Sequence, residues 1–151
     1  MRINRWVYAV ILWVGVIFFS STSLAAEWCE RAFHFLAAIL FRGLRPEDPP
    51  FGFLHLLADK GFHIALFLVL AVLLWNAVPN TPRKIAVILV CGAVVGSASE
   101  FLQRFFPGRD PAIRDVLINI VGTAIGVALS VSSLKDKIVR HKTRGEALAL
   151  K

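Results

Sequence analysis

The stretch EFLQRFFPGRDPAIRDVLINIVGTAIG, from Glu100 to Gly126, decides the fold. Glu100 and Gln103 lie three residues apart in an apolar segment that ends at a short loop, residues 107–114. Gly92 and Gly96 share a helical face with Glu100, and such a pair of small residues allows two helices to pack closely. An acid on an apolar helix is costly in lipid, so this face is expected to contact other protein or water.

The segment after the loop carries a second face of the same kind. Asp115, Asn119, Gly122 and Gly126 follow one another at spacings of four, three and four, which places all four on one side of a helix. Gly122 and Gly126 form another small-residue pair. The sequence therefore predicts two closely packed helices whose polar residues gather near the loop that joins them.

Composition indicates a membrane protein. The chain has 151 residues, of which 57% are hydrophobic, and its mean hydropathy is +0.68. A soluble domain of this size could not bury so much apolar surface. We therefore predict an all-α integral membrane protein with one domain.

The net charge of +7 does not indicate binding to nucleic acid. The basic residues lie beside the apolar runs, at the N-terminus, at Arg83 and Lys84, and in the tail from 135 to 151. That placement is typical of the charges that orient a membrane protein, and no nucleic-acid partner is expected.

Four apolar runs predict four membrane-spanning helices, at about 6–24, 62–78, 85–106 and 115–131. The first run could also be a signal peptide, because small residues stand near its end, but its length favours a retained spanning helix. Residues 28–41 are amphipathic and too short to span, so we expect an external interfacial or re-entrant helix there.

The positive-inside rule gives the orientation. With both termini and the turn at 79–84 in the cytoplasm, that side holds ten of the 17 lysines and arginines and few acids. The other side holds slightly more acids than bases. We predict a protein of the bacterial cytoplasmic membrane, with residues 135–151 as a basic cytoplasmic tail.

This topology brings the polar ends of three helices to one depth near the external surface. We expect eight side chains to converge there in an outward-facing pocket: Asp59, Lys60, His63, Glu100, Gln103, Arg109, Asp115 and Asn119. Lys60 and Arg109 could hold a phosphate, with Gln103, Asp115 and Asn119 completing the binding site.

Metal and disulfide sites are not expected, nor is any cofactor. His55, Asp59 and His63 recur every four residues, a spacing that could place ligands on one helical face, but His55 is expected to precede the helix. Cys29 and Cys91 are predicted to be unpaired thiols, because one lies outside the apolar runs and the other within one.

The order and spacing of these residues resemble the VanZ-like membrane proteins, a family named for a protein associated with resistance to teicoplanin. The matching elements are Asp59-Lys60-x-x-His63, Glu100-x-x-Gln103, Pro107-Gly108-Arg109, Asp115-x-x-x-Asn119 and Gly122-x-x-x-Gly126. The resemblance covers the domain at 1–134, apart from the segment at 28–41. It implies a cell-envelope membrane protein and supplies no reaction.

Three functions remain open from the sequence. The pocket could bind an anionic envelope lipid, such as a polyprenyl phosphate or a peptidoglycan precursor, and so affect glycopeptide susceptibility. It could instead act on a lipid phosphate or pyrophosphate, with His63 as general acid or base oriented by Asp59 or Glu100. The same polar residues could also do no more than hold the helices in register.

Overall fold

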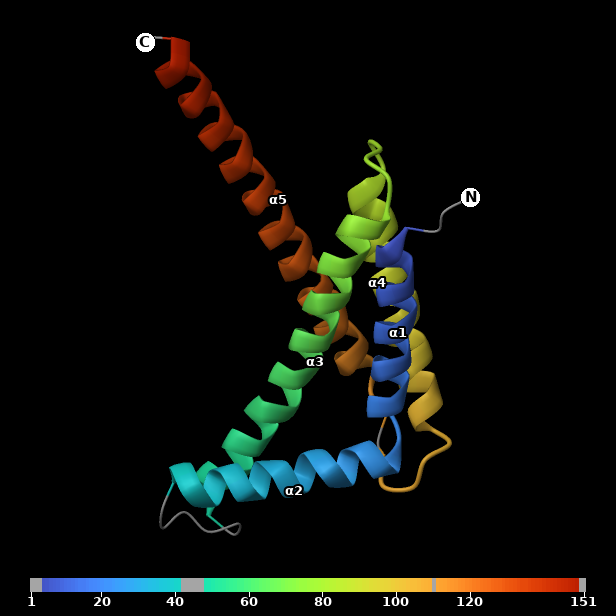
Figure 1. Cartoon of the computed structure of the whole chain (residues 1–151). Helices are drawn as coiled ribbons and strands as arrows, with labels where there is room; N and C mark the ends of the chain where they lie inside the picture. Colours follow the sequence, from blue (N-terminus) through green and yellow to red (C-terminus); the bar gives the residue numbers. More distant parts are fainter. Residues whose placement is uncertain (1–3, 42–47, 110, 150–151) are drawn as a thin grey trace.

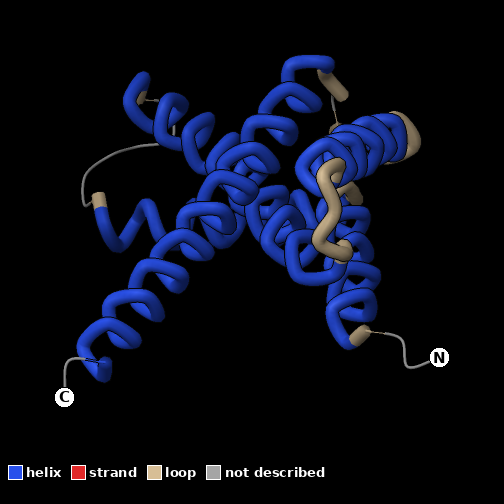
Figure 2. The backbone as a smooth tube through the Cα atoms, turned by 90° about the horizontal axis from the view of Figure 1, so that it is seen from above, coloured by secondary structure: helices blue, strands red, loops and turns tan. Residues whose placement is uncertain are grey.

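The protein is all-α, as the sequence predicts. The structure, a computed structural model, describes residues 4–41, 48–109 and 111–149, with side chains described as far as residue 133. Its helices are α1 (Arg5–Ser20), α2 (Ser23–Leu40), α3 (Pro49–Ala77), α4 (Lys84–Gln103) and α5 (Ile113–Ala149). Short loops join them, and no strand occurs in the described ranges (Figure 2).

The helices α1, α3, α4 and α5 form a bundle, and α2 lies across one end of it (Figure 1). Helix α5 packs along α3 and α4, and α1 packs along α3. The N-terminus, the turn between α3 and α4 and the C-terminus lie at one end. Helix α2 and the loop between α4 and α5 lie at the other end, so the chain crosses the bundle in alternating directions.

Three helical segments are long and apolar enough to cross a membrane: Pro49–Ala77, Lys84–Gln103 and Ile113–Ser133. Helix α1 reaches that length only when it is joined to α2, and the two are bent by 79° at the break between them. The chain therefore has the helices of a multi-pass membrane protein.

The first apolar run ends at Ser20 rather than at Leu24, because a hydroxyl cluster interrupts it. The hydroxyls of Ser20 and Ser21 donate to the carbonyl oxygen of Ile17, at 2.7 and 3.3 Å. Thr22 then caps α2, its hydroxyl accepting from the N–H of Ala25 at 3.3 Å. Such local bonds compete with the helix and redirect it, so α2 begins earlier than the predicted Trp28.

Helix α3 begins well before the predicted Phe62. Pro49 and Pro50, which precede the predicted span at 62–78, occupy the first turn of α3, where a missing N–H costs nothing. His55 consequently lies inside the helix, contrary to expectation. At about 1.5 Å per residue, the 29 residues of α3 are longer than the hydrocarbon core is thick, so in a membrane the helix would extend beyond that core or tilt within it.

The last two helices also differ from their predicted bounds. Helix α4 ends at Gln103, before the predicted Phe106, in the turn that precedes Pro107. Helix α5 begins at Ile113 and its backbone stays helical as far as Ala149, through most of the predicted basic tail. The side chains of that tail lie outside the described part.

Glycines allow α5 to lie against its neighbours. A Cβ at Gly122 would meet the carbonyl oxygen of Ile64 at 2.6 Å, and one at Gly126 would meet that of Leu68 at 2.5 Å. The glycines of α4 face α5: a Cβ at Gly92 would overlap Thr123, and one at Gly96 would lie 3.2 Å from the Cβ of Asn119. This close packing brings Asn119 and His63 within hydrogen-bonding distance.

Candidate ligand-binding site

Lys60 of α3 lies between two carboxylates. Its Nζ is 2.8 Å from Oδ2 of Asp59 and 2.9 Å from Oδ1 of Asp115 on α5. Asp115 lies in the first turn of α5, where the helix dipole favours a negative charge. Lys60 therefore ties α3 to α5, and its ammonium group is already paired with two carboxylates.

His63 forms a buried pair with Asn119. Its Nδ1 lies 3.1 Å from Oδ1 of Asn119, a side chain with no exposed surface. An amide oxygen only accepts hydrogen bonds, so Nδ1 carries the proton in this pair. The neutral ring then has its lone pair on Nε2, the nitrogen needed for proton transfer.

Glu100 supports the loop between α4 and α5. Its Oε2 accepts from the N–H of Ala112 at 3.2 Å, and its Oε1 accepts from Nε2 of Gln103 at 3.4 Å. Only 5% of the residue is exposed. Glu100 lines a smaller cavity with Ala112 and Arg104, so its carboxylate is engaged with the loop instead of the main cavity.

Arg109 projects from that loop toward the end of α1. Gly108, with φ of 72°, makes the turn before it, a conformation that favours glycine. Nη2 of Arg109 donates to the backbone oxygen of Ser20 at 3.4 Å, and the buried Nε–H of Arg109 has no partner in the part of the chain that the structure describes. Within the described ranges, which leave out Asp110, no carboxylate pairs with Arg109, whereas Lys60 is paired.

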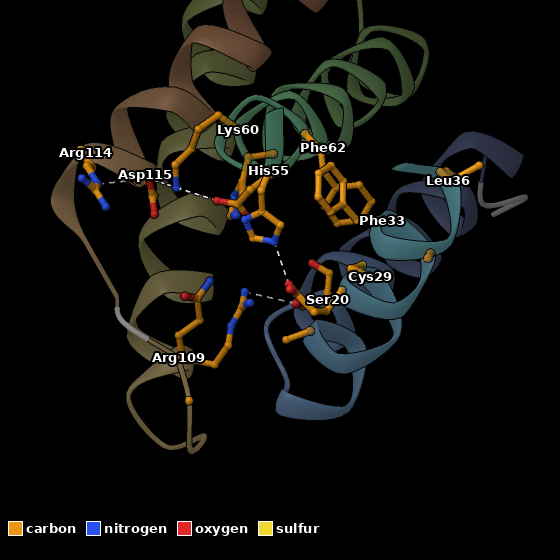
Figure 3. A pocket seen from close by; sticks show the side chains of 18 residues that line it. Ser20, Cys29, Phe33, Leu36, His55, Lys60, Phe62, Arg109, Arg114 and Asp115 are labelled. Atoms are coloured by element: carbon orange, nitrogen blue, oxygen red, sulfur yellow. Dashed lines mark hydrogen bonds and ion pairs between the residues drawn. The ribbon is translucent and has the colours of Figure 1, made fainter. Parts of the chain in front are cut away.

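These residues surround the main cavity, a space of about 670 Å³ between α2, α3, the start of α5 and the loop (Figure 3). Six of the eight predicted site residues line it: Asp59, Lys60, His63, Gln103, Arg109 and Asp115. Asn119 is bonded to His63 and reaches the cavity only through it, and Glu100 lines the smaller cavity. The structure thus brings the set together, and the roles of its members stay predictions.

The candidate metal ligands have separate partners. His55 is bonded to Glu30, Asp59 to Lys60 and His63 to Asn119. The spacing of four along α3 therefore serves three different contacts.

Sequence reasoning missed a cluster on α2 that closes the cavity. Glu30 lies 2.9 Å from Nε2 of His34 through one carboxylate oxygen, and 2.7 Å from Nε2 of His55 on α3 through the other. The ring of Phe33 lies 4.9 Å from that of His55. The spacing of four between Glu30 and His34 was visible in the sequence, but their partner on α3 was not.

The two histidines set the ionisation of Glu30. Partial burial raises the pKa of Glu30, but the hydrogen bonds from His55 and His34 outweigh it and hold that pKa below its ordinary value. Glu30 therefore remains a carboxylate that joins α2 to α3.

Comparison with known proteins agrees with the pattern of these residues. The sequence profile of the VanZ/LLP1 family matches residues 6–135. An uncharacterized protein of Schizosaccharomyces pombe is 30% identical over 94 residues, a match that covers 61% of this chain and 54% of that protein. The chain thus spans about half the length of this relative. No solved structure matches.

Proposed function

The chain belongs to the VanZ/LLP1 family, and on that premise we propose that its main cavity binds a phosphate-bearing envelope lipid, such as a polyprenyl phosphate. Arg109 is the observation that carries this proposal. Its guanidinium lines the cavity, its buried Nε–H has no partner among the described residues, and its one described acceptor is a backbone oxygen at 3.4 Å. A phosphate would accept from both nitrogens in the forked geometry that suits arginine.

The energetics favour an anion at this position. A buried donor without a partner costs about 1–3 kcal/mol, and a hydrogen bond to a charged group contributes about 1.5–3 kcal/mol. Lys60 and Asp115 already form an ion pair, which a ligand on Arg109 would not need to break. Gln103 and His63 line the same cavity and could contact other oxygens of the ligand.

We further propose that the protein has four spans and that the cavity faces outward. Helix α1 packs along α3, where the indole N–H of Trp13 donates to the backbone oxygen of Leu66 at 2.8 Å, so it shares the direction of a span. Its 16 residues extend about 24 Å, which a locally thinned bilayer accommodates. The positive-inside rule then puts both termini in the cytoplasm of a bacterial cell.

The proposed ligand also suggests a biological role, because a polyprenyl phosphate is a lipid of the cell envelope. In a bacterium, binding such a carrier would change susceptibility to glycopeptides such as teicoplanin, as the family resemblance implies.

The test is a binding measurement on the full chain in nanodiscs, with farnesyl phosphate as the probe. We expect Arg109→Gln to lower the affinity about tenfold or more, because a charge-assisted bond of about 1.5–3 kcal/mol is lost. Arg104→Gln is the matched control, since Arg104 follows α4 in the same loop region but lines only the smaller cavity. Equal affinity in Arg109→Gln and the unmodified chain would refute the binding site.

Hydrolysis of a lipid phosphate or pyrophosphate is the second candidate, favoured by the His63–Asn119 pair. That pair leaves the Nε2 lone pair of a cavity-lining imidazole free to accept a proton from water. The test is phosphate release from farnesyl pyrophosphate. If the unmodified chain releases phosphate and His63→Gln binds the lipid without releasing it, the protein is an enzyme. A third outcome is that His63→Gln, Arg109→Gln and Glu100→Gln lower thermal stability but change neither lipid binding nor phosphate release. In that case the polar residues form only a structural network.

A further inference from the structure

The main cavity is much larger than a phosphate group. Its volume of about 670 Å³ corresponds to roughly twenty water molecules at about 30 Å³ each. A phosphate bound to Arg109 would fill a small part of it. The rest of the cavity is available to another part of the ligand.

Part of the cavity wall is apolar. Six of the lining residues have no polar side-chain atom: Ala26, Ala32, Phe33, Leu36, Ala58 and Phe62. They come from α2 and α3, and Leu36 and Phe62 are 53% and 43% exposed. Figure 3 shows Phe33 and Leu36 on the side of the cavity opposite Lys60, Asp115 and Arg114. One side of the space carries Lys60, Asp115 and Arg114, and the other carries Phe33, Leu36 and Phe62 beside the Glu30–His55 pair.

The surroundings of this apolar wall indicate what can occupy it. Helix α3 is one of the segments apolar enough to cross a membrane. Helix α2 exposes Trp28, Phe35 and Ile39 on its outer surface, as a helix in a membrane interface does. The space between α2 and α3 therefore borders lipid, where the available apolar group is a hydrocarbon chain.

We propose that the main cavity has a chain subsite: the ligand lies with its phosphate on Arg109 and its hydrocarbon chain over Phe33, Leu36 and Phe62, and the chain leaves between α2 and α3 into the bilayer. This inference rests on the proposed function, because it takes the phosphate contact from there. It adds that the protein recognises the hydrocarbon chain of the lipid as well as its phosphate. It also adds that the lipid enters and leaves the cavity laterally, through the bilayer. A free phosphate would use only the charged side.

The test is a series of prenyl phosphates of increasing length, from isopentenyl to farnesyl phosphate, with inorganic phosphate as the headgroup alone. Affinity for the full chain in nanodiscs should rise at least tenfold along the series, the gain expected from burying about two methylene groups. Phe62→Ala and Leu36→Ala should each remove most of this gain while leaving the affinity for inorganic phosphate unchanged.

The chain supplies matched controls on the same helices. Phe53 on α3 and Leu40 on α2 are 61% and 68% exposed and lie outside the cavity lining, so Phe53→Ala and Leu40→Ala should keep the full gain. Equal affinities along the series, or equal effects of all four substitutions, would overturn the chain subsite and leave the phosphate site standing. If Arg109→Gln has no effect, or no phosphate binds, the proposed function fails as well.

Discussion

Asn119 shows how one residue can support both the packing and the chemistry of this protein. It is fully buried on α5, accepts from Nδ1 of His63 at 3.1 Å, and lies against Gly96 of α4. A smaller side chain would leave the imidazole N–H without a partner in the interior. The same change would remove the contact that fixes which ring nitrogen of His63 carries the proton.

We predict that Asn119→Ala lowers the free energy of unfolding by about 1–3 kcal/mol, the cost of an unsatisfied buried donor. Thr123→Val is the control, because the Thr123 hydroxyl donates only to the Asn119 carbonyl of its own helix, at 2.9 Å, and should cost less. Thermal unfolding in detergent measures both. Equal losses would show that the His63–Asn119 bond contributes nothing specific.

The sequence could predict which residues gather, but not which partner each one takes. Acids and amides on apolar helices must find polar neighbours, and this places Asp59, Glu100 and Asp115 at the same end. Glu100 could have met Lys60, yet it accepts from the loop N–H of Ala112 instead. Such choices depend on helix rotation and loop shape to within an ångström, which residue spacing does not encode.

At the scale of the elements, the contact between α3 and α5 depends on glycine. We predict that Gly122→Ala and Gly126→Ala each lower stability by about 1–3 kcal/mol or more, because the added methyl group would collide with backbone oxygens of Ile64 and Leu68 that cannot move away independently. Thermal unfolding of the purified variants measures the loss.

Gly15→Ala is the matched control for these two substitutions. A Cβ at Gly15 of α1 would have no neighbour within 4 Å. Its stability should be unchanged or higher by up to about 1 kcal/mol, because alanine is the better helix former. A similar loss at all three positions would mean that the methyl group acts on the helix itself and not on the contact.

The stability of the contact between Glu30 of α2 and His55 of α3 should depend on pH. Because the two histidines hold its pKa below the ordinary value, its contribution to stability is present at neutral pH and is lost as pH falls through that lowered pKa. We predict that the stability difference between the unmodified chain and Glu30→Gln, about 0.2–1 kcal/mol for a half-exposed pair, closes in acid. Thermal unfolding of both proteins across an acidic pH series tests this, and a gap that widens in acid would contradict it.

Element boundaries were harder to predict than element types, for a reason visible in two places. The serines and threonine at 20–22 read as the end of a span, but their hydroxyls bend the chain by 79° and start another helix at once. The prolines at 49 and 50 read as loop residues, but they suit the first turn of α3. Each pattern marks a helix terminus. The sequence does not show whether that terminus is the end of the preceding helix or the start of the following one.

At the scale of the whole molecule, the cavity lies at one end of the bundle because successive helices cross the bundle in opposite directions. The loop between α4 and α5 and all of α2 lie at the end away from the termini (Figure 1). The hydroxyl of Ser23 donates to the backbone oxygen of Pro107 at 2.7 Å, which holds α2 and the loop together. If the chain spans a membrane as proposed, Arg109 lies near one of the two membrane surfaces, and the orientation of the chain decides which surface that is.

Cys29 can report that orientation, because it is exposed on α2 and lines the cavity. In a Cys91→Ser chain, we predict that a membrane-impermeant maleimide labels Cys29 in intact cells. A cysteine introduced as Asn80→Cys, in the exposed turn between α3 and α4, should be labelled only after permeabilisation. The opposite pattern would place the cavity in the cytoplasm and the basic turn with Arg83 and Lys84 outside, contrary to the positive-inside rule. If the orientation is as predicted, farnesyl phosphate should also slow the labelling of Cys29 and leave that of Asn80→Cys unchanged, which connects the sidedness of the molecule to the site itself.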